Sequence, residues 1–296
     1  MHLYLDEEKK NPKHIGHKYC VMEKYDGWYM YIDCIDGQWQ EIKSRAGRVI
    51  PSMINYTKQF QSVDGKYRPK RNVRLIFEGV IPNEKGYPTE FKTANGWFNR
   101  KAPIHKPVLL MCHDLLTFDH LDTPFKTRYE TLQYLIGIYR QNKLVDGLGA
   151  VPILYTSNRP SEWYGTYENI IKQYDNQGEG VILKRLDAPY SSDKRNADLL
   201  KIKCEKTFEL RVVGKVEGEG KYKGTLGKLI VEDANGIRNG ISGMSDEQRH
   251  LWWKDFEGTI EGAIVEVQCM KVLSNKSLRE GRFKAVRHDK TEIDTL

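Results

Sequence analysis

Residues 21–44 read VMEKYDGWYMYIDCIDGQWQEIKS, and two features of this stretch indicate how the chain folds. The segments WYMYIDCI and QWQEIKS read as two strands, because they are short, rich in aromatic and β-branched residues and bounded by turn residues. Asp36 and Gly37 lie between them, and an Asp-Gly pair in this position is a strong sign of a tight hairpin turn. Lys24 comes shortly before the hairpin, next to an Asp-Gly pair of its own and among apolar and aromatic residues.

The rest of the first 200 residues mixes strands with a few helices. The runs VRLIFEGVI and PVLLMCHDLL read as buried strands, and GEGVILKRL reads as a further strand. The runs KTRYETLQYLIGIYRQ and EWYGTYENIIKQY have apolar residues at helical spacing. Strands and helices are thus mixed in this part of the chain, as they are in an α+β domain.

The pattern changes after Lys203. Short strands, frequent glycines and tight turns follow, and one helix, SDEQRHLWWKDF, interrupts them with Ser245 as its N-cap and Gln248 three residues later. Five short strands with one inserted helix suit a small closed β-barrel such as an OB-fold. We therefore expect two domains, residues 1–204 and residues 205–296.

Composition narrows the class of protein. The chain has 296 residues, a formal net charge of +7 and a pI near 8.9, which favours a polyanionic partner, nucleic acid above all. Its five cysteines show no CxxC pair and no zinc-ligand spacing, so free thiols in a reducing compartment are expected. The first residues, MHLYLDEEKKNP, lack the apolar run of a signal peptide, and no segment is long and apolar enough to span a bilayer. A cytoplasmic location, in a bacterium or a phage-infected host, and a monomer are the expectations.

The setting of Lys24 has two readings. A lysine beside an Asp-Gly turn is commonly a surface residue, whereas a desolvated lysine near other cations can act as a nucleophile. Nucleophilic attack on phosphorus also requires carboxylates for a metal ion and cations for the phosphates. The downstream strands supply candidates: Glu78 and Glu179 as acids, and Lys201 and Lys203, which alternate in LLKIK and so share a face.

The order of these motifs resembles that of ATP-dependent DNA ligases of the covalent nucleotidyltransferase superfamily, in particular the minimal ligases of phages and bacteria. The resemblance covers nearly the whole chain, and the motifs that carry it are EKYDG, SRAG, FEG, MCHDLL, EGVILKR, LLKIK and RFKAVRHDK.

The resemblance implies a fold, a function and a set of site residues. The fold would be an adenylyltransferase domain of antiparallel sheets with helices, followed by an OB-fold domain. The function would be ATP-dependent sealing of 5′-phosphate/3′-hydroxyl nicks in double-stranded DNA, in replication, repair and recombination, with ATP and Mg²⁺ or Mn²⁺. The implied residues are Lys24 as the adenylylated nucleophile, with Asp26, Lys201 and Lys203 as catalytic residues; Met22, Glu23, Arg45, Glu78, His113, Arg282, Arg287, Asp289 and Lys290 at the nucleotide; Glu78 and Glu179 at the metal; and Arg45, Lys66, Arg68, Lys70 and Arg71 at the DNA.

Two positions depart from the family pattern. Tyr29 stands where an arginine usually contacts the nucleotide sugar, and His113 stands where phenylalanine or tyrosine usually stacks on adenine. The separate N-terminal DNA-binding domain of larger ligases is not expected, because Lys24 lies near the start of the sequence, so the two domains and their basic loops would hold the DNA.

Three other functions stay open. An mRNA capping guanylyltransferase shares the lysine motif and the OB domain but usually has tryptophan at the position of Ile202. An RNA ligase lacks the OB blocks GKYKGTLGKLIVE and SDEQRHLWWKD that this chain carries. A non-catalytic nucleic-acid-binding OB protein would need only the charge and the barrel.

Overall fold

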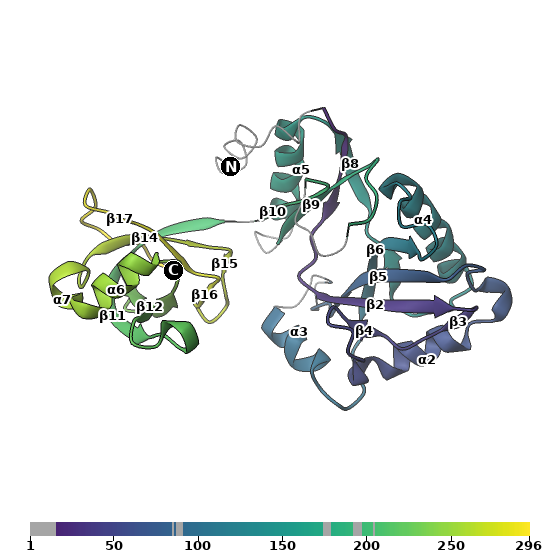
Figure 1. Ribbon diagram of the computed structural model, residues 1–296, viewed down its shortest axis with the longest axis horizontal. Coiled ribbons are helices and arrows are strands. Elements are labelled where there is room, and N and C mark those ends of the chain that lie inside the picture. Colours follow the sequence, from purple (N-terminus) through teal and green to yellow (C-terminus); the bar gives the residue numbers. More distant parts are fainter. Residues whose placement is uncertain (1–15, 85, 87–90, 174–178, 192–196, 204) are drawn as a thin grey trace. The chain divides into compact units, whose positions relative to one another are not determined.

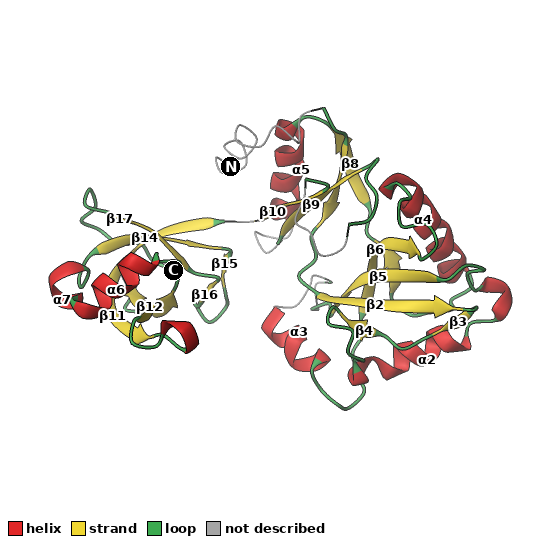
Figure 2. Cartoon of the chain, viewed as in Figure 1, coloured by secondary structure: helices red, strands yellow, loops and turns green. Residues whose placement is uncertain are grey.

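The computed structural model describes residues 16–84, 86, 91–173, 179–191, 197–203 and 205–296. The N-terminal twelve residues discussed above, and Cys204, lie outside this part. The chain forms two compact units that divide between Ile202 and Lys203, two residues before the expected boundary. Each unit has its own hydrophobic core and sheet system (Figures 1 and 2).

The larger sheet of the first unit grows from the predicted hairpin. Asp36 and Gly37 both have positive φ angles, 49° and 70°, and Ile35 pairs with Gln38 across them, as in a type I′ turn. All neighbouring strands are antiparallel except the last pair, β6 and β7, which is parallel. The sheet has the order β3 (Gln38–Trp39), β2 (Trp28–Ile35), β5 (Val73–Val80), β6 (Leu109–Thr117) and β7 (Leu148–Ala150), with β4 (Lys43–Ser44) also paired to β2.

The segment QWQEIKS was expected to be one strand, and this expectation is wrong. It forms two short strands, β3 and β4, separated by residues 40–42. Trp39 and Ile42 are both buried, and residues three apart cannot point to the same face of a regular strand. The backbone N–H of Ile42 instead donates to Thr57 Oγ1 on the helix below, so the chain leaves the sheet to bury both side chains.

Helices cover this sheet and complete the main core (Figure 2). Trp39 and Phe60 pack beside Tyr139, whose hydroxyl accepts a hydrogen bond from Trp39 Nε1 at 2.9 Å. The helices of the unit are α2 (Ile54–Ser62), α3 (Phe91–Phe98), α4 (Phe125–Gln141) and α5 (Pro160–Gln173).

A second sheet packs between the main core and α5. Its strand β1 is buried on both faces: Cys20 and Met22 join the main core, whereas Tyr19 and Val21 pack with Trp163 of α5. This explains why its sequence lacks the alternation of a half-exposed strand. The sheet has the order β10 (Leu199–Lys203), β9 (Gly180–Arg185), β1 (Tyr19–Glu23) and β8 (Ile153–Ser157).

The second unit is a small barrel. A parallel bridge between Ser242 and Arg282 joins the two outer strands of its five-stranded sheet and closes the barrel. Ser245 and Gln248 form the predicted capping box at the start of the helix, which ends at Lys254 and is followed by a short second helix. The elements are β11 (Lys206–Glu217), β12 (Leu226–Glu232), β13 (Arg238–Ile241), α6 (Asp246–Lys254), α7 (Phe256–Thr259), β14 (Ile264–Cys269), β15 (Lys271–Val272), β16 (Leu278–Arg279) and β17 (Arg282–Val286).

Four cysteines in the described part of the chain are buried and form no disulfide bond: Cys20, Cys34, Cys112 and Cys269. Burial raises the pKa of the Cys20 and Cys34 thiols to about 11. No helix in the described residues is long and apolar enough to cross a membrane.

Candidate active site

Lys24 lies directly after β1, where the neighbouring strand β9 begins. Its backbone N–H donates to the carbonyl of Gly180 at 3.0 Å, which continues the antiparallel pairing of Glu23 with Val181. The same register brings Lys24 Nζ to 2.5 Å from Glu179 Oε1. The two side chains are 14% and 7% exposed, so this is a largely buried ion pair. The expectation of cations near Lys24 is therefore incomplete, since the group in contact with it is a carboxylate.

Glu78 faces the same cluster from the larger sheet. It pairs across β2 and β5 with Tyr29, so both side chains are on one face. Burial raises the pKa of Glu78 to about 7, although the charges of Lys24 and Arg45 oppose this rise. The charges of Glu179 and Lys201 also act on Glu78, so the sequence-predicted acids and cations of the first unit converge here.

Arg45 approaches this cluster from the exposed loop that follows β4. Its guanidinium lies 4.6 Å from the centre of the Tyr29 ring, at the distance of a cation–π contact. Tyr29 stands where the sequence resemblance leads us to expect an arginine, and in this structure another arginine rests on its ring.

Carboxylate oxygens at this site suit a divalent metal ion. Mg²⁺ usually takes one or two protein carboxylates and completes its shell with water and substrate phosphates. Glu78 and Glu179 supply two such carboxylates. The described residues contain no group of three or more histidine, cysteine or carboxylate side chains that could hold an ion by themselves. The residues therefore fit an ion that a phosphate-bearing substrate helps to hold.

His113 occupies an irregular position in β6. Ile76 pairs with Asp114 and Phe77 pairs with Cys112, so His113 is the extra residue of a β-bulge. Its ring centre lies 6.2 Å from that of Tyr29. Burial lowers the pKa of His113 to about 3, with a further contribution from Lys184, so the imidazole is neutral at pH 7.

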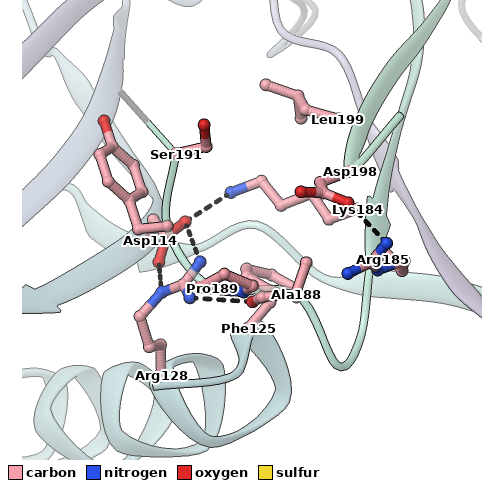
Figure 3. Close-up of a pocket in the computed structure, with 11 residues that line it drawn as sticks. Asp114, Phe125, Arg128, Lys184, Arg185, Ala188, Pro189, Ser191, Asp198 and Leu199 are labelled. Carbon is pink, nitrogen blue, oxygen red and sulfur yellow. Dashed lines mark hydrogen bonds and ion pairs between the residues drawn. The ribbon is translucent and has the colours of Figure 1, made fainter. Parts of the chain in front are cut away.

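A buried polar cluster beside His113 was not predicted from the sequence. Lys184 contacts His113. Lys184 also contacts Asp114, and Arg128 holds both oxygens of Asp114 at 2.9 and 3.2 Å (Figure 3). The sequence signals for this cluster were Asp114 in the apolar run MCHDLL and Lys184 in the apolar run GVILKR. Such charged residues are rarely buried unless they are paired. The cluster borders a small open pocket, and none of Lys24, Glu78 and Glu179 lies in its wall.

The remaining predicted residues of the first unit have mixed surroundings. Met22 packs in the main core, and Glu23 is buried. In the basic stretch, Arg68 donates to the backbone carbonyls of residues 37, 61 and 63 and to the Gln38 side chain, which ties the hairpin to the end of α2. This internal role weighs against a DNA contact by Arg68, whereas Lys66, Lys70 and Arg71 are exposed.

The candidate residues of the second unit are paired mainly with acids. Arg287 contacts three carboxylates, those of Glu209, Glu266 and Asp289, and its hydrogen bonds hold the pKa of Asp289 well below the usual range. Lys203, the first residue of this unit, lies 3.3 Å from the sulfur of Met270. Arg282 contacts Glu280 at 3.3 Å, and Lys290 is exposed.

Comparison with known proteins places these residues in a family context. The family model described as ATP dependent DNA ligase domain matches residues 5–203. A DNA ligase of Thermococcus fumicolans is 27% identical over an alignment that covers 92% of this chain and 53% of that protein. A DNA ligase of Natronomonas pharaonis is 26% identical, with 93% and 52% covered. The chain thus spans about half the length of these curated relatives.

Solved structures share the fold. The structure named Pmar-Lig_PreS3 gives a TM-score of 0.77 at 22% identity, covering 95% of this chain and 66% of that one. A Lig E DNA ligase, described as binding DNA with a minimal scaffold, gives 0.65 at 22% identity, covering 91% and 92%. The predicted fold class, an α+β adenylation domain followed by an OB-fold domain, is confirmed.

Proposed function

The chain belongs to the family of ATP-dependent DNA ligase domains, and from this membership we propose that it seals nicks in duplex DNA through a covalent lysine–AMP intermediate. The observation that carries the proposal is the position of Lys24, held 2.5 Å from Glu179 at the junction of β1 and β9, with Glu78 within electrostatic reach.

In the first step, Lys24 is the nucleophile. Its amine must part from Glu179 and lose a proton before its lone pair can attack the α-phosphorus of ATP. A nitrogen–phosphorus bond forms, the bond from that phosphorus to the bridging oxygen breaks, and pyrophosphate leaves. Arg45 and Lys201, whose charges already act on this cluster, stabilise the negative charge that develops on the phosphoryl oxygens.

The second and third steps use the stored AMP. The 5′-phosphate of the nick attacks the phosphorus of lysine–AMP, which releases Lys24 and leaves AMP joined to the DNA end. The 3′-hydroxyl then attacks the 5′-phosphate, a phosphodiester bond forms and AMP leaves. Arg45, exposed beside the site, is suited to hold the 5′-phosphate.

The acids of the cluster have a separate task. Glu78 and Glu179 would hold Mg²⁺ or Mn²⁺, and such an ion, when bound, offsets the negative charge around the α-phosphate. The raised pKa of Glu78, about 7, means that its charge at neutral pH depends on a nearby cation.

Covalent labelling tests the proposal. Purified protein incubated with ATP labelled at the α-phosphorus should acquire a label that survives denaturing electrophoresis. Lys24→Ala should lose the label yet still seal a nick that already carries AMP. Lys18→Ala is the matched control, since Lys18 is an exposed lysine at the margin of the same strand, and it should label normally. Persistent labelling of Lys24→Ala would place the nucleophile elsewhere.

Parallel assays with other nucleotides and other nucleic acids distinguish the alternative functions. Labelling by GTP in place of ATP would indicate a capping guanylyltransferase, and sealing of nicked RNA but not of nicked duplex DNA would indicate an RNA ligase. DNA binding without any covalent label would indicate a non-catalytic OB protein. The proposal expects labelling and nick sealing with ATP and neither with NAD.

A further inference from the structure

The Lys184 ammonium group makes three polar contacts inside the first unit. Its Nζ lies 2.7 Å from the His113 carbonyl oxygen, 3.2 Å from Asp114 Oδ2 and 3.3 Å from His113 Nδ1. The side chain is 9% exposed. A lysine ammonium has three N–H donors, so these three contacts account for all of them.

The surroundings of Lys184 fix its position. Asp114 is shared between Lys184 and Arg128 (Figure 3), and Arg128 is itself held by the carbonyls of Thr123 and Ala188. Although burial alone would raise it, the pKa of Asp114 stays below its ordinary value because both cations face the carboxylate. The Phe125 ring covers the ammonium at 4.6 Å.

The contact with Nδ1 determines the tautomer of His113. An ammonium can donate but cannot accept a hydrogen bond, so the ring nitrogen facing it must be the acceptor. The ring hydrogen then sits on Nε2. Protonation of both nitrogens is opposed by burial and by the charge of Lys184, which together lower the pKa of His113 to about 3.

We propose that Lys184 is a positioning residue that holds His113 as the neutral Nε2–H tautomer, with its ring fixed to stack on the adenine of ATP. The inference rests on the proposed function for the identity of the stacked base. A phenyl ring has no tautomers and needs no such partner, whereas an imidazole can change its tautomer, charge and orientation. Lys184 removes that freedom at the bulge that carries His113.

The tautomer can be measured on the unmodified protein. Long-range ¹H–¹⁵N spectra of protein labelled at histidine should show one neutral tautomer for His113, with Nδ1 unprotonated. His113→Phe identifies the signal among the 8 histidines. A protonated Nδ1, or a mixture of tautomers, overturns the inference, and this result does not depend on whether any Lys184 variant folds.

A double-mutant cycle tests the route by which Lys184 acts. Lys184→Met keeps the apolar stem and removes the donors, and it should weaken ATP binding by roughly three- to ten-fold, the loss expected for one hydrogen bond. In the His113→Phe background the same change should have no further effect on the ATP Kd. Equal losses in the two backgrounds would mean that Lys184 acts through the fold or touches the nucleotide directly, which overturns the positioning role.

These results stay distinct from the test of function. Wild-type protein that takes no label from ATP overturns the proposed function while leaving the hydrogen bond to Nδ1 measurable. Labelled protein with a protonated Nδ1 overturns the positioning role alone.

Discussion

At the scale of single residues, the ionisation of Glu78 couples the site to the stability of the fold. Burial raises its pKa from an ordinary value near 4.5 to about 7, so the folded state binds this proton more tightly than the unfolded state does. Stability from this group is therefore fully present below about pH 4.5 and is lost as the pH rises through about 7.

Replacing this carboxyl should remove the pH-dependent loss. In the absence of nucleotide and metal, Glu78→Gln should be more stable than the wild type at pH 8, by about 1.4 kcal/mol for each unit by which the folded pKa is raised. At pH 4 the difference should nearly vanish. Denaturant unfolding at the two pH values measures it, and an equal difference at both would show that Glu78 ionises as an exposed carboxyl does.

The sequence predicted single residues well where a motif carried them. Lys24 and Glu179 form an ion pair and both charges act on Glu78, so the three residues named from the motifs lie near one another, while their roles stay predictions. The contact between Lys184 and His113 was not predicted, because it joins residues 71 positions apart and depends on a β-bulge that no residue type in the sequence indicates. The internal role of Arg68 was missed for a similar reason, since a basic run does not show which guanidinium meets backbone carbonyls.

At the scale of elements, the backbone conformation directly before β7 requires a glycine, Gly147. Gly147 has a φ of +66°, and its carbonyl accepts a hydrogen bond from Leu110 at the start of the parallel partner β6. A Cβ at this position would lie 2.1 Å from the carbonyl oxygen of Val108. The position therefore excludes a side chain both by backbone conformation and by space.

Gly147→Ala should destabilise the protein strongly, and Gly149→Ala provides the matched control two residues later. Left-handed backbone alone costs roughly 1–2 kcal/mol for a residue with a Cβ, and the overlap with Val108 adds to this. At Gly149 the nearest atom to an added Cβ is 3.8 Å away, so that change should cost less than about 1 kcal/mol. Similar losses in unfolding free energy for the two variants would contradict the argument.

Local chemistry explains which elements the sequence predicted. Asp36-Gly37 and the Ser245 cap are complete within a few residues, so the turn and the helix start were predicted correctly. The split of β3 from β4 depends on α2, which lies beyond the segment that was read, and could not be seen in it.

At the scale of the whole molecule, the proposed function requires that part of the formal charge of +7 is exposed where DNA phosphates could reach it. Lys66, Lys70 and Arg71 are exposed on one loop, and the first and last of them have aspartate neighbours 3.6 and 3.5 Å away. Contacts of this length at the surface are weak, so phosphate can replace them.

Changing these three residues to alanine should weaken binding of a nicked duplex and reduce the salt dependence. Each lost phosphate contact lowers the slope of log K against log salt by about 0.9. The control removes the same charge elsewhere on the first unit, at the exposed residues Lys58, Lys126 and Arg140. If the two triple variants weaken binding equally, only net charge matters and the loop is not a contact surface.

The second unit should act on one step more than on the others. Arg287 is tied to three carboxylates, whereas Lys290 is exposed and is the better candidate to meet the pyrophosphate of ATP. Pyrophosphate leaves only in the first step, so Lys290→Ala should slow protein adenylylation by roughly 10²-fold and sealing of a pre-adenylylated nick far less.

Single-turnover rates of the two steps measure this difference. Lys284→Ala, which removes an exposed lysine from β17 of the same barrel, is the control and should leave both rates unchanged. Equal losses in both steps for Lys290→Ala would assign the residue to DNA binding or to the stability of the barrel.

Alkylation of the buried cysteines can be used to measure local opening of the folded protein. Cys20 lies in the smaller sheet, Cys34 and Cys112 lie in the larger one, and Cys269 lies in the barrel. A thiol at 0–1% exposure reacts with an alkylating reagent only after the chain around it has opened. The rate at which each cysteine is alkylated under native conditions therefore measures how often the structure around it opens, and peptide mapping would report the opening of the three sheets separately.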